Sequence, residues 1–82
     1  MEKSIFTREY KTFLTHLRAV RERAGLTQED LADRLNETQS FVSKCERGER
    51  RLDLIEVRAV CQAMGVSFPK FAAELEIQLS NG

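Results

Sequence analysis

Apolar positions recur along most of this chain at the spacing of amphipathic helices. In the first such segment they step by 3, 1, 3, 3 and 4 residues, through Tyr10, Phe13, Leu14, Leu17, Val20 and Ala24. This spacing predicts a helix that begins at Thr7 and ends at Gly25. His16 is the only histidine, and we expect it on the surface of this helix because no partner lies near it in the sequence.

Two shorter helices are predicted between Thr27 and Gly48. Thr27 has an acid three residues on, which is the spacing of a capping box, and Asn36 suits the left-handed conformation that ends a helix. Thr38 can cap the next helix. Each helix carries a narrow apolar face, formed by Leu31, Ala32 and Leu35 and by Phe41, Val42 and Cys45. Two short helices joined by a tight turn have the geometry of a helix-turn-helix, whose second helix enters the DNA major groove.

Two more helices complete the pattern. Asp53, with Glu56 at the third helical position, predicts a helix that ends at Gly65. Its expected buried face consists of Leu54, Val57, Ala59, Val60, Cys61 and Met64. A last helix, capped by Ser67 or Phe68, carries an apolar stripe as far as Leu79. The fold class is therefore all-α, with five helices in a single domain at residues 7–79 and an N-terminal arm at residues 1–6.

The net charge of zero, from 13 basic and 13 acidic residues, at first argues against a nucleic-acid partner. The distribution of charge changes this picture, because local charge density decides whether phosphates are attracted. Lys44, Arg47, Arg50 and Arg51 cluster at the end of the third predicted helix and just after it. The helix dipole favours Lys44 and Arg47 there, but it does not account for the Arg50–Arg51 pair beyond the glycine.

Several other classes of protein are disfavoured. No apolar run approaches the roughly 20 residues of a membrane span, and charges interrupt the N-terminus where a signal peptide needs apolar residues. We therefore expect a cytoplasmic protein. Cys45 and Cys61 lie on apolar helical faces and form no CxxC or Cys/His cluster, so we expect buried reduced thiols, no metal and no cofactor. Since His16 has no catalytic partner nearby and no glycine-rich phosphate loop is present, an enzyme is not expected.

Three segments carry a resemblance to a known family: LTQEDLADRLN, TQSFVSKCERGERRLD and AMGVSF. Together they resemble the phage-repressor/Cro-like helix-turn-helix family, also called the XRE family, over about residues 10–76. The resemblance implies a compact five-helix, lambda-repressor-like DNA-binding domain, in a family that usually regulates transcription as dimers on two-fold symmetric operators. It also implies a structural ion pair between Arg21 and Glu46. One departure is Asn36-Glu37, where the family most often has glycine followed by an apolar residue.

The third predicted helix should present its first two turns to base edges. Gln39 is the best candidate reader, because its amide can pair with adenine N6 and N7. Lys44 can donate to guanine or to a phosphate, and Ser40 and Ser43 can each reach a base, a phosphate or only water. Phe41 either packs inward or presses on a thymine methyl. The base-reading candidates are Thr38, Gln39, Ser40, Ser43 and Lys44.

Four residues are candidates for contacts to DNA phosphates. Gln28, at the start of the second predicted helix, can bind a phosphate with its side chain and backbone N–H, and the resemblance supports that role. The alternative is a solvated first-turn glutamine. Arg47, Arg50 and Arg51 would bind the flanking backbone.

The leading functional hypothesis is a sequence-specific transcriptional regulator, in particular a repressor. It would bind a palindromic operator in double-stranded DNA as a homodimer, with the helix at residues 38–47 in the major groove. The expected dimer interface consists of Phe71, Leu75, Ile77 and Leu79, unless these residues only cover the monomer core. The alternative is an antitoxin or another protein-interaction module, which sequesters a protein partner and also binds its own promoter.

Overall fold

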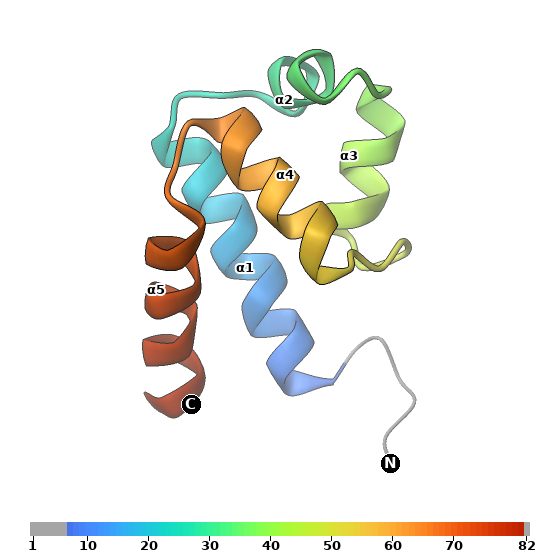
Figure 1. Ribbon diagram of the computed structural model, residues 1–82. Helices are drawn as coiled ribbons and strands as arrows, with labels where there is room; N and C mark the ends of the chain where they lie inside the picture. Colours follow the sequence, from blue (N-terminus) through green and yellow to red (C-terminus); the bar gives the residue numbers. More distant parts are fainter. Residues whose placement is uncertain (1–6, 82) are drawn as a thin grey trace.

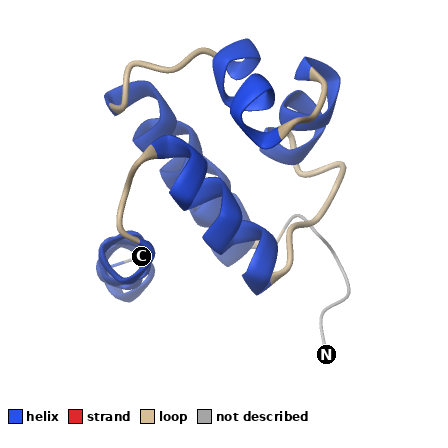
Figure 2. Cartoon of the chain, turned by 45° about the horizontal axis from the view of Figure 1, so that its top comes forward, coloured by secondary structure: helices blue, strands red, loops and turns tan. Residues whose placement is uncertain are grey.

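The computed structural model describes residues 7–81, which form five helices and no strand (Figures 1 and 2). The helices are α1 (Arg8–Arg23), α2 (Gln28–Leu35), α3 (Gln39–Glu46), α4 (Leu54–Met64) and α5 (Phe68–Asn81). This arrangement confirms the predicted all-α fold class with five helices. The last helix runs past the predicted end at Leu79, and the predicted arm lies outside the described residues.

Two capping boxes fix where α2 and α4 begin, as the sequence predicts. At α2, Thr27 Oγ1 accepts from the Asp30 N–H at 3.0 Å, and Asp30 Oδ2 accepts from the Thr27 N–H at 2.9 Å. At α4, Asp53 and Glu56 exchange the same two bonds at 2.7 and 2.9 Å. Each box satisfies two backbone donors that would otherwise lack a partner at a helix start.

The turn between α2 and α3 closes despite its unusual sequence. Asn36 adopts the left-handed conformation, with φ 61° and ψ 37°. The Glu37 N–H then donates to the Ala32 carbonyl at 2.9 Å, which satisfies one of the last carbonyls of α2. The Glu37 side chain is exposed, so its charge is not buried where the family commonly has an apolar residue. Thr38 Oγ1 accepts from the Phe41 N–H at 3.1 Å and starts α3.

The helices pack around one core, with α5 on one side of the domain and α3 on the other (Figure 1). α2 packs against α3 and α4, whereas α5 packs against α1 and α4. The best-buried apolar side chains include Leu17, Leu31, Ala32, Val42, Val60, Cys61, Met64 and Phe71. Cys45 and Cys61 are buried free thiols, as expected. Within residues 7–81, no helix is both long and apolar enough to cross a bilayer.

The expectation that His16 lies on the surface is wrong. His16 is only 2% exposed, because it faces α5 and packs against the Phe71 ring with centroids 4.5 Å apart. Its Nε2 lies 3.1 Å from the Phe71 carbonyl oxygen, and its Nδ1 lies 2.9 Å from Gln78 Nε2. Partners 55 and 62 residues away satisfy both ring nitrogens, which explains why the local sequence gave no sign of them.

Two other burial predictions are also corrected. Leu54 is 68% exposed because it lies in the first turn of α4, outside the core cluster, and Ala59 is exposed because it is on the opposite side of the helix from Val57. Phe71 is 3% exposed and belongs to the core cluster, so it is not available for a dimer interface. Ile77 is 61% exposed, whereas Leu75 and Leu79 are half-buried.

Candidate DNA-binding surface

The predicted base-reading residues lie on the side of α3 away from its buried residues. Gln39, Ser40 and Lys44 are exposed, whereas Val42 and Cys45 are buried on the opposite side. Ser43 is half-buried, and Thr38 uses its hydroxyl oxygen for the helix cap. Phe41 is half-buried and packs against the core. The exposed side of α3 therefore presents an amide, a hydroxyl and an ammonium group to solvent.

A buried ion pair holds α3 against α1. Arg21 Nε and Nη2 donate to Glu46 Oε2 and Oε1 at 2.6 and 3.1 Å, a bidentate geometry that fixes both side chains. Arg21 Nη1 also donates to the Leu26 carbonyl at 2.8 Å. The side chains of Arg21 and Glu46 are 7% and 6% exposed. The structure thus brings together the two residues that the resemblance implies as a pair.

The ion pair continues outward through two glutamine side chains. Gln28 Nε2 donates to Glu46 Oε1 at 2.9 Å, and Gln39 Nε2 donates to Gln28 Oε1 at 2.7 Å. A carboxylate paired with arginine only accepts, so Gln28 must turn its NH2 group toward Glu46 and its oxygen toward Gln39. This polarity fixes the orientation of the Gln39 amide. The link between Gln28 and Gln39 joins two helices across the turn, and sequence reasoning missed it.

The guanidinium group of Arg47 contacts two side chains of the same protein. Its Nε and Nη2 donate to Glu49 Oε2 and Oε1 at 2.8 and 3.3 Å, and its Nη1 contacts Ser43 Oγ. The hydrogen bond with Glu49 raises the pKa of Arg47 above its ordinary value, and the same bond lowers the pKa of Glu49. Both groups are therefore charged at neutral pH, and Ser43 shares its hydroxyl with Arg47.

Arg50 lies between a carboxylate and an aromatic ring. Its Nη1 and Nη2 approach Glu56 Oε1 and Oε2 at 2.8 and 2.7 Å, and its guanidinium carbon lies 5.1 Å from the centre of the Phe41 ring. The hydrogen bond from Arg50, followed by the Asp53 N–H, lowers the pKa of Glu56. The hydrogen bond with Glu56 raises the pKa of Arg50. Arg50 is therefore fixed beside α3 and is not freely extended.

Arg51 is held by a residue at the start of α1. Its guanidinium carbon lies 4.4 Å from the centre of the Tyr10 ring, within the range of a cation–π contact. The Leu52 N–H also donates to the Tyr10 hydroxyl at 3.4 Å. Tyr10 thus positions the loop that follows α3. The sequence identified Tyr10 only as part of an apolar face, and no local signal pointed to this contact.

The basic cluster of residues 44, 47, 50 and 51 contains two kinds of residue. Arg47 and Arg50 are paired with carboxylates, whereas Lys44 and Arg51 have no ion-pair partner within residues 7–81. All four are exposed. Local positive charge on this side of the domain is therefore reduced, but not removed, by the acids next to it.

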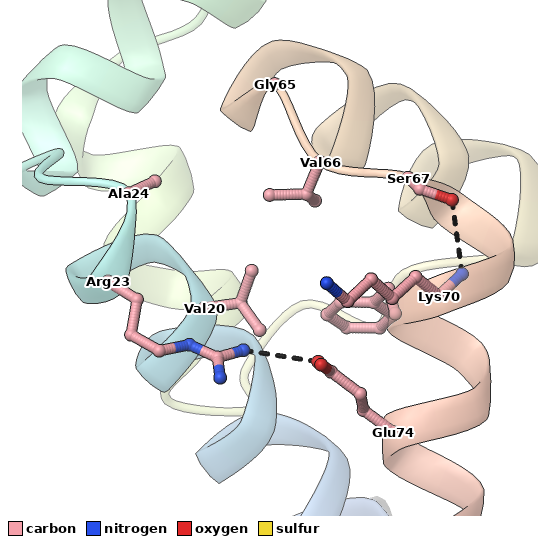
Figure 3. Close-up of a pocket in the computed structure, with 9 residues that line it drawn as sticks. Val20, Arg23, Ala24, Gly65, Val66, Ser67, Lys70 and Glu74 are labelled. Atoms are coloured by element: carbon pink, nitrogen blue, oxygen red, sulfur yellow. Dashed lines mark hydrogen bonds and ion pairs between the residues drawn. The ribbon is translucent and has the colours of Figure 1, made fainter.

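A second surface feature lies away from α3. A groove between the end of α1 and the start of α5 is lined by Val20, Val66 and Phe71, with Lys70 at its rim (Figure 3). An ion pair from Arg23 to Glu74, at 3.2 Å, crosses it. No group of three or more metal-ligating side chains exists among residues 7–81. The residues that line the groove do not form an arrangement of side chains typical of a catalytic site.

Comparison with known proteins identifies the family. A family model described as Helix-turn-helix matches residues 17–71, which is more than half of the chain and includes α2 and α3. The chain belongs to the XRE (Cro/C1-type) helix-turn-helix family. The Helix-turn-helix match ends at Phe71, so it includes the buried start of α5 but not the exposed Ile77.

Two solved structures are similar to this XRE-family domain. An XRE-family like protein from Pseudomonas syringae pv. tomato str. DC3000 is 43% identical, with a TM-score of 0.79 and coverage of 85% of both chains. The clp gene regulator ClgR from C. glutamicum is 24% identical, with a TM-score of 0.75 and coverage of 88% of this chain and 94% of the other. The second likeness shows the fold alone. A search of curated proteins gave no match.

Family membership makes the domain a DNA-binding domain of the kind that regulates transcription, and the family is not one of enzymes. DNA is therefore the class of partner that the domain binds.

Proposed function

We propose that this chain is a sequence-specific repressor that reads a palindromic operator with α3 in the major groove. The observation that carries the proposal is the hydrogen-bonded chain from Arg21 through Glu46 and Gln28 to Gln39. It ties an exposed amide at the first position of α3 to a buried ion pair. A side chain oriented before it meets DNA loses less conformational entropy on binding than a free one.

The direction of these hydrogen bonds favours adenine as the base that Gln39 contacts. One N–H of Gln39 donates to Gln28, which leaves its second N–H and its oxygen free to face DNA. Adenine N7 accepts from such an N–H, and adenine N6 donates to such an oxygen. Ser40 and Lys44 lie on the same exposed side and extend the proposed reading surface. Ser43 would become available to DNA once the hydrogen bond from Arg47 to its hydroxyl oxygen is broken.

Phosphate contacts are proposed on both sides of α3. Gln28 lies at the start of α2, where free backbone N–H groups and the helix dipole favour an anion. Arg47, Arg50 and Arg51 would contact the backbone beyond the other end of α3. These contacts fix the register of the domain on the duplex and carry no sequence information themselves.

Selection of bound sequences from a random duplex pool tests the proposal. The expected result is an enriched site with an adenine in each half, and half-sites about 34 Å apart along the duplex. Gln39→Ala should weaken binding to that site by ~1–3 kcal/mol and relax the preference at one position, whereas Arg51→Ala should weaken all sequences alike. Unchanged binding of Gln39→Ala would remove Gln39 as the reader.

The homodimer is a further part of the proposal. On α5, Ile77 is exposed and Leu75 and Leu79 are half-buried. The proposed interface consists of these three residues, because Phe71, the fourth residue of the predicted interface, belongs to the core. Analytical ultracentrifugation at up to roughly 100 μM, a range that detects even weak association, measures the oligomeric state. A monomer at every concentration would refute an interface on α5 in the absence of DNA.

A further inference from the structure

Two basic residues of the proposed phosphate-binding set hold a carboxylate of the same chain. The guanidinium of Arg47 binds both oxygens of Glu49, and that of Arg50 binds both oxygens of Glu56. A bidentate carboxylate uses the same N–H donors that a phosphate would use. A DNA phosphate can therefore reach either guanidinium fork only in competition with an acid of the protein itself.

The two acids differ in how they are held. Glu56 also accepts from the Asp53 N–H at 2.9 Å, so its position is part of the cap of α4. Glu49 follows α3, its side chain is 52% exposed, and Arg47 is its one hydrogen-bonding side-chain partner within residues 7–81. Glu49 can turn into solvent without loosening a helix, whereas Glu56 cannot. Only Glu49 is displaceable at low cost.

We propose that Glu49 is an internal competitor of the DNA backbone, which occupies the Arg47 fork in the free protein and is displaced by a phosphate in the complex. The inference rests on the proposed function, because it takes Arg47 as a phosphate contact. Glu49 thereby lowers the affinity for every duplex, whatever its sequence. A larger share of the binding free energy is then left to the base contacts of α3, which discriminate between sequences.

The decisive variant is Glu49→Gln in the full chain. The probe is a fluorescently labelled duplex of random sequence, and its anisotropy is measured at several salt concentrations. Loss of an exposed ion-pair partner should tighten binding at low salt by about 1.5-fold to fivefold. The slope of log K against log salt should change by much less than ~0.9, the value for one phosphate neutralised, because Arg47 contacts its phosphate in both complexes. Binding to a selected operator should tighten by a similar factor.

Glu76→Gln is the matched control. It makes the same change in formal charge, but Glu76 lies on α5, on the other side of the domain from α3 in Figure 1. Its oxygen accepts from Ser80, and it belongs to neither the core nor the basic cluster. This variant should bind both duplexes as the unmodified chain does. Equal effects of Glu49→Gln and Glu76→Gln would reduce the result to net charge and overturn the inference.

An Arg47→Ala background separates the inference from the proposed function. If Glu49 acts through Arg47, adding Glu49→Gln to Arg47→Ala changes nothing, and a persistent effect overturns the inference. If Arg47→Ala weakens binding but Glu49→Gln binds as the unmodified chain, only the inference fails. If neither Arg47→Ala nor Gln39→Ala alters binding to any duplex, the proposed function itself fails.

Discussion

Removal of one partner of the Arg21–Glu46 pair should be among the most damaging single changes in this domain. In Glu46→Ala, the Arg21 guanidinium keeps its 7% exposed position but loses both carboxylate bonds. Gln28 Nε2 loses its acceptor as well. Breaking a buried pair on one side typically costs about 3–5 kcal/mol, because a buried charge is left uncompensated.

The size of this effect is large for a chain of 82 residues. At roughly 0.05–0.15 kcal/mol per residue, such a chain has about 4–12 kcal/mol of total stability. A loss of about 3 kcal/mol would lower the melting temperature by roughly 12–24 °C in a domain of this size. Glu49→Ala is the control, because it removes an acid from a pair that is about half exposed, and such pairs contribute about 0–1 kcal/mol.

Thermal unfolding followed by circular dichroism, together with urea unfolding, measures both variants. A melting temperature for Glu46→Ala equal to that of Glu49→Ala would refute the reasoning. The double variant Arg21→Met/Glu46→Leu then separates stability from function. It should recover much of the stability, because buried pairs can be replaced by apolar residues of similar volume. It should not recover DNA binding, because Gln28 no longer has a fixed acceptor.

Two further predictions concern the helix ends. Asn36→Ala should destabilise the fold by about 1 kcal/mol, because alanine is strained at a φ of 61°, whereas Asn36→Gly should not; urea unfolding compares them, and equal losses would contradict this account. The pKa of Glu56 is lowered by Arg50 and the Asp53 N–H, so its contribution to stability is present above a pH of about 4.3 and is lost as the pH falls through its lower folded-state value. Glu56→Gln should flatten the acid limb of a melting-temperature profile, and an unchanged limb would show that other groups cause it.

The sequence predicted the helices well because their signals are local. The caps at Thr27, Thr38 and Asp53 lie within three residues of their partners, and Asn36 defines its turn by its own backbone preference. An apolar stripe gives only a period, so it located the elements better than it located their burial. Leu54 fits the stripe of α4 but lies in its first turn, outside the contact with the rest of the core.

The contacts that sequence reasoning missed all join distant segments. His16 is buried only because α5 returns to cover α1, and Tyr10 reaches the loop after α3 for the same kind of reason. The bond between Gln28 and Gln39 depends on the angle between α2 and α3, which no periodicity encodes. The acids beside Arg47 and Arg50 are close in sequence, but the bidentate pairs on which the proposed competition of Glu49 with phosphate rests become visible only in the structure.

Residues on the exposed side of α3 differ in how far they can be exchanged. Gln39 is connected to the buried ion pair through its hydrogen bond to Gln28, so a replacement of Gln39 also removes the donor to the Gln28 side-chain oxygen. Ser40 and Lys44 are exposed, and neither forms a side-chain hydrogen bond within residues 7–81. Under the proposed function, operator preference can therefore change at Ser40 and Lys44 with little effect on folding, whereas a change at Gln39 calls for a compensating change at Gln28.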